Sequence, residues 1–194
     1  MKPDQSPSLM IAKKMEKDGI FVEIGTWEGG FSTALVSYTQ CKKLYCVDPY
    51  KHFTNDEYPD GMNRLSQEQF DAKFATTRNL LQQFGDRVEM VRLESSEAVA
   101  TFADESLDYV YIDGNHDYTY VLNDIKLWYP KVKKGGFLCG DDVYSTDLKE
   151  HDADGNVTRV WGPGCWGKYG TYKAAVDSGY PFIVDGTQFI MKKE

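Results

Sequence analysis

Short apolar runs alternate with segments of helical periodicity along most of the chain, and this alternation restricts the fold most. Strands that alternate with helices form a mostly parallel sheet covered by helices on both faces. Two β-rich runs flank Asp185-Gly186, which predicts a tight terminal hairpin that adds one reversed strand. The expected strands are residues 20–24, 44–47, 88–93, 107–112, 137–139, 182–184 and 189–191. The pattern predicts an α/β fold with a mostly parallel seven-stranded sheet and a reversed C-terminal strand.

The length of 194 residues favours a single domain. Ser6-Pro7 suits the start of a helix, so we expect residues 1–18 to form an N-terminal helical segment. Ser95 is a typical cap residue and predicts another short helix over 95–102. Residues 144–167 are polar and aromatic without a clear period. Because a loop of that length is usually functional, we expect 144–167 to form a substrate loop.

Composition restricts the partners and the compartment. A net charge of −8 disfavours binding to a phosphate backbone, so we expect no nucleic-acid partner. No long apolar run follows the N-terminal Lys2, which predicts neither a signal peptide nor a membrane span. None of the four cysteines forms a CxxC pair, which favours reduced thiols. These features together predict a cytoplasmic protein.

A glycine-rich turn follows the first expected strand and precedes a helix. Gly25 allows a tight turn, while Gly29 and Gly30 let the backbone approach a ligand. The spacing is GxxxGG rather than GxGxxG, so a dinucleotide pyrophosphate is not the best fit. Glu23 and Glu28 make the turn acidic, which suits the cationic part of an amino acid.

Asp48 ends the second expected strand, 23 residues after Gly25. An acid at that place can accept hydrogen bonds from ribose hydroxyls. The turn and the acid together favour a nucleoside-type cofactor. The alternative is a structural glycine turn followed by a solvated acid.

Two acidic clusters follow two further strands. Asp113 and His116 come directly after the run 107–112, and Asp141-Asp142 follows the fifth strand. Three carboxylates and one imidazole at neighbouring strand ends could converge on one hard cation, and they suit Mg²⁺, Ca²⁺ or Mn²⁺ better than zinc. In the alternative, Asp113 caps the next helix, the acidic pair is a solvated strand end, and His116 only supports other ligands.

In their order along the chain, these features resemble a class I S-adenosylmethionine-dependent methyltransferase. The resemblance covers about residues 18–192 and implies a Rossmann-like, doubly wound sheet. It is closest to the metal-dependent small-molecule O-methyltransferases, which include catechol O-methyltransferase and the macrocin-type, macrolide-sugar enzymes. The matching segments are Glu23-Ile24-Gly25, Asp48-Pro49-Tyr50, the Ser95 region, Asp113-Gly114-Asn115-His116 and the final hairpin.

The resemblance implies a donor site for S-adenosyl-L-methionine. In the family the turn holds the methionine part, the acid after the second strand holds the ribose, and Tyr50 would pack near the adenosine. A Gly-x-Ser stretch usually lies beside the adenine, whereas this chain has Leu93-Glu94-Ser95 and lacks the glycine. The implied donor-binding residues are Glu23, Gly25, Thr26, Gly29, Ser32, Asp48, Tyr50, Glu94, Ser95 and Asp113.

The resemblance also implies a metal and a base. Asp113, Asp141 and Asp142 match the positions that bind Mg²⁺ in the metal-dependent branch. Catechol-type enzymes carry a lysine three residues after the first acid, whereas this chain has His116, as the macrolide-sugar type does. A histidine there implies a general base and favours a sugar or other alcohol hydroxyl over a catechol.

The sequence thus predicts a Mg²⁺-assisted O-methyltransferase whose partner is a small hydroxylated molecule, such as a sugar or other polyol. Three alternatives stay open. They are a metal-independent methyltransferase, a nucleotide-binding oxidoreductase without a reversed final hairpin, and a non-catalytic cofactor-binding protein. The resemblance also leaves a homodimer open, since some relatives form dimers.

Overall fold

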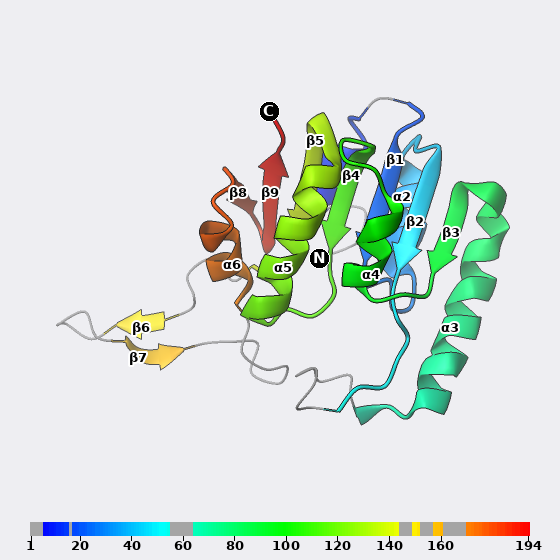
Figure 1. The fold of residues 1–194 in the computed structure, drawn as a ribbon, viewed down its shortest axis with the longest axis horizontal. Helices are drawn as coiled ribbons and strands as arrows, with labels where there is room; N and C mark the ends of the chain where they lie inside the picture. Colours follow the sequence, from blue (N-terminus) through cyan, green and yellow to red (C-terminus); the bar gives the residue numbers. More distant parts are fainter. Residues whose placement is uncertain (1–5, 16, 55–63, 144–148, 152–156, 161–169) are drawn as a thin grey trace.

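A seven-stranded sheet forms the centre of the protein in a computed structural model (Figure 1). The strand order is β3-β2-β1-β4-β5-β9-β8, with β9 antiparallel to both of its neighbours and the first five strands parallel. The strands are β1 (Ile20–Ile24), β2 (Lys43–Val47), β3 (Val88–Val91), β4 (Leu107–Ile112), β5 (Val132–Gly140), β8 (Ile183–Asp185) and β9 (Gln188–Lys192). The predicted α/β fold with a reversed C-terminal strand is confirmed. The structure describes residues 6–15, 17–54, 64–143, 149–151, 157–160 and 170–194.

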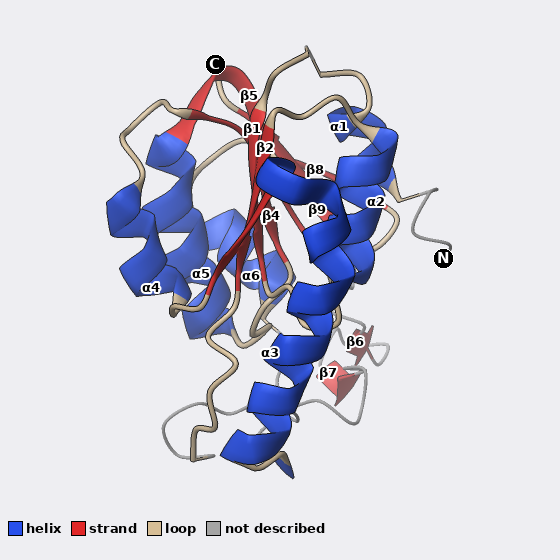
Figure 2. Cartoon of the chain, turned by 90° about the vertical axis from the view of Figure 1, so that its right-hand side faces the viewer, coloured by secondary structure: helices blue, strands red, loops and turns tan. Residues whose placement is uncertain are grey.

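Helices cover both faces of the sheet. Figure 2 shows α1, α2 and α3 on one side and α4, α5 and α6 on the other. The helices are α1 (Pro7–Ala12), α2 (Gly30–Tyr38), α3 (Gln67–Leu81), α4 (Ser95–Ala98), α5 (Tyr118–Trp128) and α6 (Thr171–Asp177). Short 3-10 segments follow three of them, at Gln82–Arg87, Val99–Thr101 and Tyr129–Lys131.

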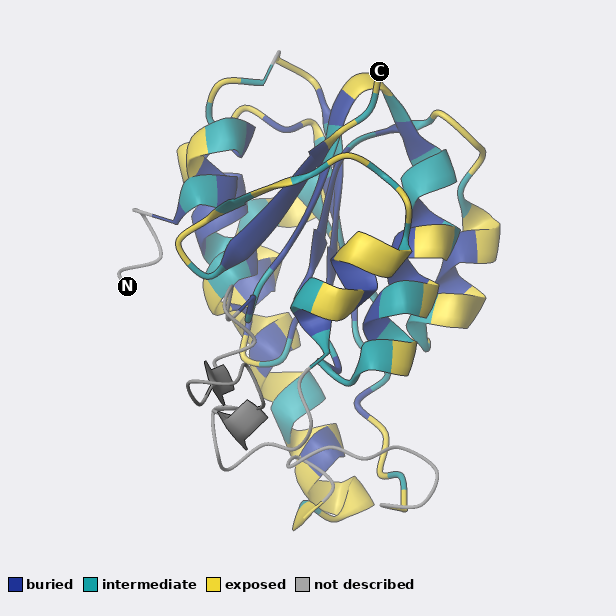
Figure 3. Cartoon of the chain, turned by 90° about the vertical axis from the view of Figure 1, so that its left-hand side faces the viewer, coloured by how far each residue is buried: buried dark blue, intermediate teal, exposed yellow. Residues whose placement is uncertain are grey.

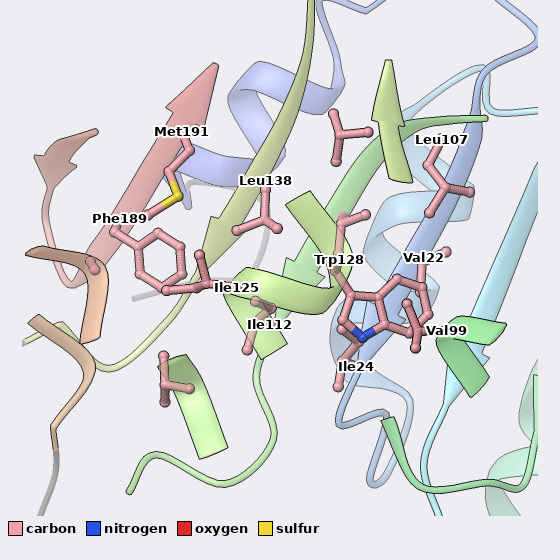
Figure 4. Packing of buried hydrophobic residues seen from close by; sticks show 14 of the residues in the cluster. Val22, Ile24, Val99, Leu107, Ile112, Ile125, Trp128, Leu138, Phe189 and Met191 are labelled. Carbon is pink, nitrogen blue, oxygen red and sulfur yellow. The ribbon is translucent and has the colours of Figure 1, made fainter. Parts of the chain in front are cut away.

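The apolar core lies in two layers, one on each side of the sheet. On the α5 side, Trp128 and Ile125 pack with β1 and β4 residues, among them Val22 (Figure 4). On the α2 side, Leu35 packs with Leu44 and other strand residues. Burying one such side chain stabilises the fold by about 1.5–3 kcal/mol. Figure 3 shows the buried strands between helices whose outer surfaces are exposed.

The N-terminal helix starts as expected and ends early. Ser6 is its N-cap and its hydroxyl accepts a hydrogen bond from the Leu9 N–H, with Pro7 at the first helical position. The expected helical segment 1–18 is longer than the helix, which ends at Ala12 where the last turn tightens, and residues 1–5 and 16 lie outside the described residues. The N–H of Lys14 donates to the Ile11 carbonyl, three residues back instead of four.

Two other local predictions are corrected. Glu94, not Ser95, is the N-cap of α4, and its N–H donates to the Glu97 carboxylate at 3.2 Å. Ser95 is not available as a cap because its hydroxyl donates to Asp124. In the terminal hairpin Asp185 pairs with Gln188, so the two-residue loop lies one residue later than expected.

The expected loop 144–167 contains strands that the sequence did not indicate. Segments β6 (Lys149–His151) and β7 (Val157–Val160) pair in an antiparallel two-stranded sheet. The rest of this stretch, which includes Cys165, lies outside the described residues, and its role as a substrate loop stays a prediction. The other three cysteines are buried free thiols. Among the described helices, none has the length and apolar character needed to cross a membrane.

The β1 and β4 ends are joined at Gly25. The Asp113 N–H donates to the Ile24 carbonyl at 2.7 Å, and the Gly25 N–H donates to the Val47 carbonyl at 2.9 Å. Gly25 has a φ of +90°, and a Cβ there would lie 2.1 Å from the Asp113 carbonyl oxygen. Only glycine fits this backbone approach, which sets the glycine turn beside the first acidic cluster.

We expect Gly25→Ala to be strongly destabilising, by about 4 kcal/mol or more, since both φ and contact distance forbid a side chain. The matched control is Gly135→Ala. Gly135 has a φ of +81° but open space around its Cβ position. This control should lose only about 1–2 kcal/mol for its left-handed backbone. Urea unfolding of both variants measures the difference. Equal losses would contradict the close approach.

Candidate active site

A cavity of about 570 Å³ opens at the carboxyl ends of β1, β2 and β4. Most of the predicted donor-binding residues line it, namely Glu23, Gly25, Thr26, Asp48, Tyr50, Glu94, Ser95 and Asp113. Two predicted residues do not. Gly29 turns toward α3, where a Cβ would lie 3.1 Å from Thr77, and the buried Ser32 donates its hydroxyl to Glu23. Both support the cavity wall from behind.

Asp48 is fixed at the β2 end by the backbone. Its Oδ2 accepts from the Trp27 N–H and its Oδ1 from the Tyr50 N–H, both at 2.9 Å. Tyr50 is buried, and its hydroxyl donates to the Trp27 carbonyl at 2.6 Å. These bonds hold the carboxylate in one orientation at the cavity wall.

The cavity lining is strongly acidic, and Lys51 is the one basic residue among the described residues that line it. Lys51 is itself bound to Glu94 at 2.8 Å. Burial raises the pKa of Glu23 well above its usual value, although the Ser32 hydrogen bond opposes the rise. The acidic residues in the lining are Glu23, Glu28, Asp48, Glu94, Asp113 and Asp124. Such a lining favours a cationic ligand.

Asp124 is a cavity residue that the sequence reasoning missed. It is 7% exposed and its Oδ1 accepts from the Ser95 hydroxyl at 2.6 Å. The Trp128 indole N–H donates to the same hydroxyl at 2.7 Å. Burial raises the pKa of Asp124 to about 7, against the hydrogen bond from Ser95. The signal was available, since Asp124 lies three residues after Val121 and four before Trp128, on the apolar stripe of α5.

His116 stands between two carboxylates. Its Nε2 lies 3.5 Å from Asp113 Oδ1 and 3.7 Å from Asp142 Oδ2, and its side chain is 15% exposed. Burial acts to lower the pKa of His116, but Asp113 and then Asp142 outweigh it, so the pKa is raised. Burial also raises the pKa of Asp113 to about 6, which the imidazole opposes. Asp113 belongs both to this group and to the cavity lining.

Asp141 does not join that group. Its Oδ2 accepts from the Tyr111 hydroxyl at 2.9 Å. Its Oδ1 accepts from the Thr187 hydroxyl at 3.0 Å and the Asp142 N–H at 2.8 Å. Within the described part of the chain, no three His, Cys, Asp or Glu side chains are arranged to hold a metal ion. The predicted three-carboxylate Mg²⁺ site is therefore not assembled, because the third carboxylate is engaged elsewhere.

A family model described as a methyltransferase domain matches residues 22–143. This match contains both the cavity wall and His116 with the neighbouring Asp113 and Asp142, which together form the acid–imidazole group. The chain belongs to this methyltransferase-domain family. It is an S-adenosylmethionine-dependent methyltransferase, as the sequence predicted.

The methyltransferase is also similar to individual proteins. It is 30% identical over 176 residues to the uncharacterized protein R132 of Acanthamoeba polyphaga mimivirus, covering 88% of this chain and 72% of that one. Its fold matches the cofactor-bound Rv0187 from MTB with a TM-score of 0.59 and 18% identity, over 96% and 78% of the two chains. Precorrin-6y C5,15-methyltransferase from Geobacter metallireducens matches with a TM-score of 0.55 and 13% identity, over 91% and 71%. The two structural matches establish the shared fold alone.

The cavity fits the methyl donor of this family. S-adenosylmethionine carries a sulfonium cation and an ammonium group, which suit the acidic lining. Gly30 adds room at the start of α2, because it lines the cavity and a Cβ there would meet no atom within 4 Å. The residues present at the metal position fit a divalent cation only in part, since Asp113 and Asp142 face His116 while the carboxylate of Asp141 is hydrogen-bonded to Tyr111 and Thr187.

We expect Asp124 to make the donor-free protein less stable as the pH rises. Its folded pKa of about 7 exceeds its unfolded value of about 3.9, so the folded state binds more protons between them. Stability should therefore fall from about pH 4 to pH 7, by about 1.4 kcal/mol for each pKa unit. Asp124→Asn should lack this slope, so its stability relative to the wild type should rise with pH.

Urea unfolding at pH 5 and pH 8 measures this effect. Asp104→Asn is the control, because Lys131 lowers the pKa of that exposed carboxylate rather than raising it. If wild type and Asp124→Asn changed in parallel with pH, the buried carboxyl would not have the assigned raised pKa.

Proposed function

We propose that the enzyme transfers the methyl group of S-adenosylmethionine to a hydroxyl of a small molecule, with His116 as the general base. The observation that carries this proposal is that Asp113 belongs both to the cavity lining and to the group around His116. One residue borders the acidic cavity and also lies 3.5 Å from the His116 Nε2. A methyl donor in the cavity and a hydroxyl beside His116 would therefore be neighbours.

The donor would be held by residues that already line the cavity. Glu23, Thr26 and the Gly30 backbone would bind the methionine part, and Asp48 would accept hydrogen bonds from the ribose. Ser95 and its neighbour Glu94 would lie beside the adenine. When bound, the donor supplies an electrophilic methyl group on a sulfonium sulfur. The protein orients the donor so that its methyl group faces one acceptor oxygen and no other nucleophile.

His116 supplies the basic function that an alcohol acceptor requires. Aliphatic hydroxyls are poor nucleophiles at neutral pH, so removal of their proton assists attack. Neutral His116 accepts that proton, and Asp113 and Asp142 stabilise the imidazolium that results. A general base of this kind contributes typically about 10²–10⁴-fold in rate. Proximity and orientation of the two reactants supply much of the rest.

A polyol or sugar is the acceptor class that this edge of the cavity suits. Asp113 and Asp142 both present carboxylate oxygens near the imidazole Nε2, and their side chains are 34% and 31% exposed. Carboxylates accept hydrogen bonds, and a molecule with several hydroxyls can donate one to each while a third faces His116. A sugar fulfils this requirement better than a molecule with a single hydroxyl.

The Mg²⁺-assisted form of the reaction is the second candidate. It is favoured by two of the three predicted ligands, because Asp113 and Asp142 face the same imidazole nitrogen. The third, Asp141, would have to leave Tyr111 and Thr187. We therefore rank the base mechanism first. The oxidoreductase alternative is wrong in its topology, because β9 runs antiparallel to β5.

We expect turnover to rise with pH through an inflection above the usual histidine value of about 6.5, because the base must be neutral. A radiolabelled methyl-transfer screen over myo-inositol, methyl glucoside, methyl mannoside and catechol provides the acceptor. His116→Gln should lower kcat by about 10²-fold or more and remove this inflection. Asp142→Asn should move the inflection to lower pH, because it removes a charge that raises the pKa of His116.

His52→Gln is the matched control, since His52 lies in a loop and its Nδ1 is 2.8 Å from the Leu65 carbonyl oxygen. It should retain wild-type kcat and pH dependence. A His116→Gln variant that kept full turnover across pH 6–8 would contradict the proposed base.

Removal of divalent cations separates the two forms of the reaction. We expect turnover with the best acceptor of the screen to survive dialysis against EDTA, because His116 needs no metal to accept a proton. A loss of turnover that Mg²⁺ restores, and that Ca²⁺ or buffer does not, would contradict the base-only mechanism and establish the second candidate. Donor affinity measured by calorimetry in both buffers controls for indirect effects.

A further inference from the structure

A chain of buried hydrogen bonds connects the N-terminal helix to Asp141. We propose that this chain, through Gln188 and Tyr111, positions Asp142 beside His116, so that Gln188 and Tyr111 are positioning residues for proton removal from the acceptor. The inference rests on the proposed role of His116. It gives a role to Asp141, whose carboxylate accepts a hydrogen bond from Tyr111.

The chain has three links. The Ser8 N–H donates to Gln188 Oε1 at 2.8 Å, Gln188 Nε2 donates to the Tyr111 hydroxyl at 2.8 Å, and that hydroxyl donates to Asp141 Oδ2 at 2.9 Å. Ser8, Tyr111 and Gln188 are 0%, 1% and 3% exposed. Loss of one partner would therefore leave a buried polar group without a hydrogen bond, which costs free energy of folding. Segments from α1, β4 and β9 meet in this one chain.

The direction of every link is fixed by chemistry. A backbone N–H can only donate, so the Gln188 oxygen must face Ser8 and its amide nitrogen must face Tyr111. The Tyr111 oxygen therefore accepts from Gln188, and its single proton is left for Asp141. If the amide nitrogen of Gln188 were replaced by an oxygen, that oxygen would accept the Tyr111 proton in place of Asp141.

Asp141 in turn fixes the backbone of its neighbour. Its Oδ1 accepts from the Asp142 N–H at 2.8 Å and from the Thr187 hydroxyl at 3.0 Å. Asp142 has a φ of +54°, a left-handed conformation that non-glycine residues adopt only with support. In this conformation its Oδ2 lies 3.7 Å from His116 Nε2. The chain thus ends on the second carboxylate that faces the base.

The Tyr111 ring is held independently of its hydroxyl. It stacks on Phe31 with ring centroids 4.0 Å apart. Tyr111→Phe therefore removes the proton donor and keeps the packing. Gln188→Glu keeps the oxygen that accepts from Ser8, but its second oxygen competes with Asp141 for the Tyr111 proton. Both variants should displace Asp142 for the same reason, because each removes the hydrogen bond from Tyr111 to Asp141.

The test is a double-mutant cycle of Tyr111→Phe and Gln188→Glu, assayed with the best acceptor of the screen. We expect each single variant to lower kcat by about tenfold or more, since a small misplacement at a reacting group can cost up to about 10²-fold. The double variant should be no slower than the slower single variant, because both act through one proton. Donor affinity by calorimetry should stay within about twofold of wild type, since none of these residues lines the donor cavity.

Tyr109→Phe is the matched control. Tyr109 lies on the same strand and is equally buried, but its hydroxyl makes no hydrogen bond to Asp141. It should retain wild-type kcat. Thr187→Val, which removes the partly exposed donor to Asp141 Oδ1, provides a second route to the same effect should a buried variant fail to fold. Thermal unfolding of each variant reports folding.

Three results would overturn the inference. They are unchanged kcat in Tyr111→Phe and Gln188→Glu, effects that multiply in the double variant, or an equal loss in Tyr109→Phe. Each of these leaves the proposed function standing if His116→Gln is inactive. If His116→Gln keeps its turnover, the proposed function fails first, and the positioning role in proton removal fails with it.

Discussion

The backbone contact between Gly25 and Asp113 is the constraint on which the rest of the site depends. Hydrogen bonds from Asp113 to Ile24 and from Gly25 to Val47 hold the neighbouring strand ends together, and a side chain at Gly25 would overlap the Asp113 carbonyl. Because Gly25 has no side chain, the two backbone segments can approach this closely, and the glycine turn and the first acidic cluster lie at one edge of the sheet. The donor cavity and the acid–imidazole group are therefore adjacent, and they share Asp113.

Electrostatics gives this edge its chemical character. Burial raises the pKa of Glu23, Asp113 and Asp124, because it disfavours the charged form of these cavity carboxyls. A cationic donor would relieve that situation. Asp113, together with Asp142, also raises the pKa of His116, which strengthens the base that accepts a proton from the alcohol. Asp113 is the acid that serves both halves of the proposed reaction, because it lines the donor cavity and faces His116.

The sequence predicted the fold class well and the partners of individual side chains less well. Apolar runs and turn residues were enough for the α/β fold, the reversed strand and the cavity residues near Gly25 and Asp48, because strand ends of a parallel sheet meet at one edge. Asp141 was assigned to a metal because sequence position cannot show that Tyr111 and Thr187 already occupy its oxygens. The Gln188–Ser8 contact joins residues 180 positions apart, which no local pattern contains. Asp124 was visible on the α5 stripe and was overlooked.

A crystal structure of the enzyme with S-adenosylhomocysteine, the product of the methyl donor, tests most directly whether the cavity holds the donor beside His116. We expect the ligand in the cavity, with its ribose hydroxyls on Asp48 and its sulfur at the end bordered by Asp113, on the side of His116. A ligand bound elsewhere, or bound in the reverse direction with its adenine beside Asp113, would contradict this expectation.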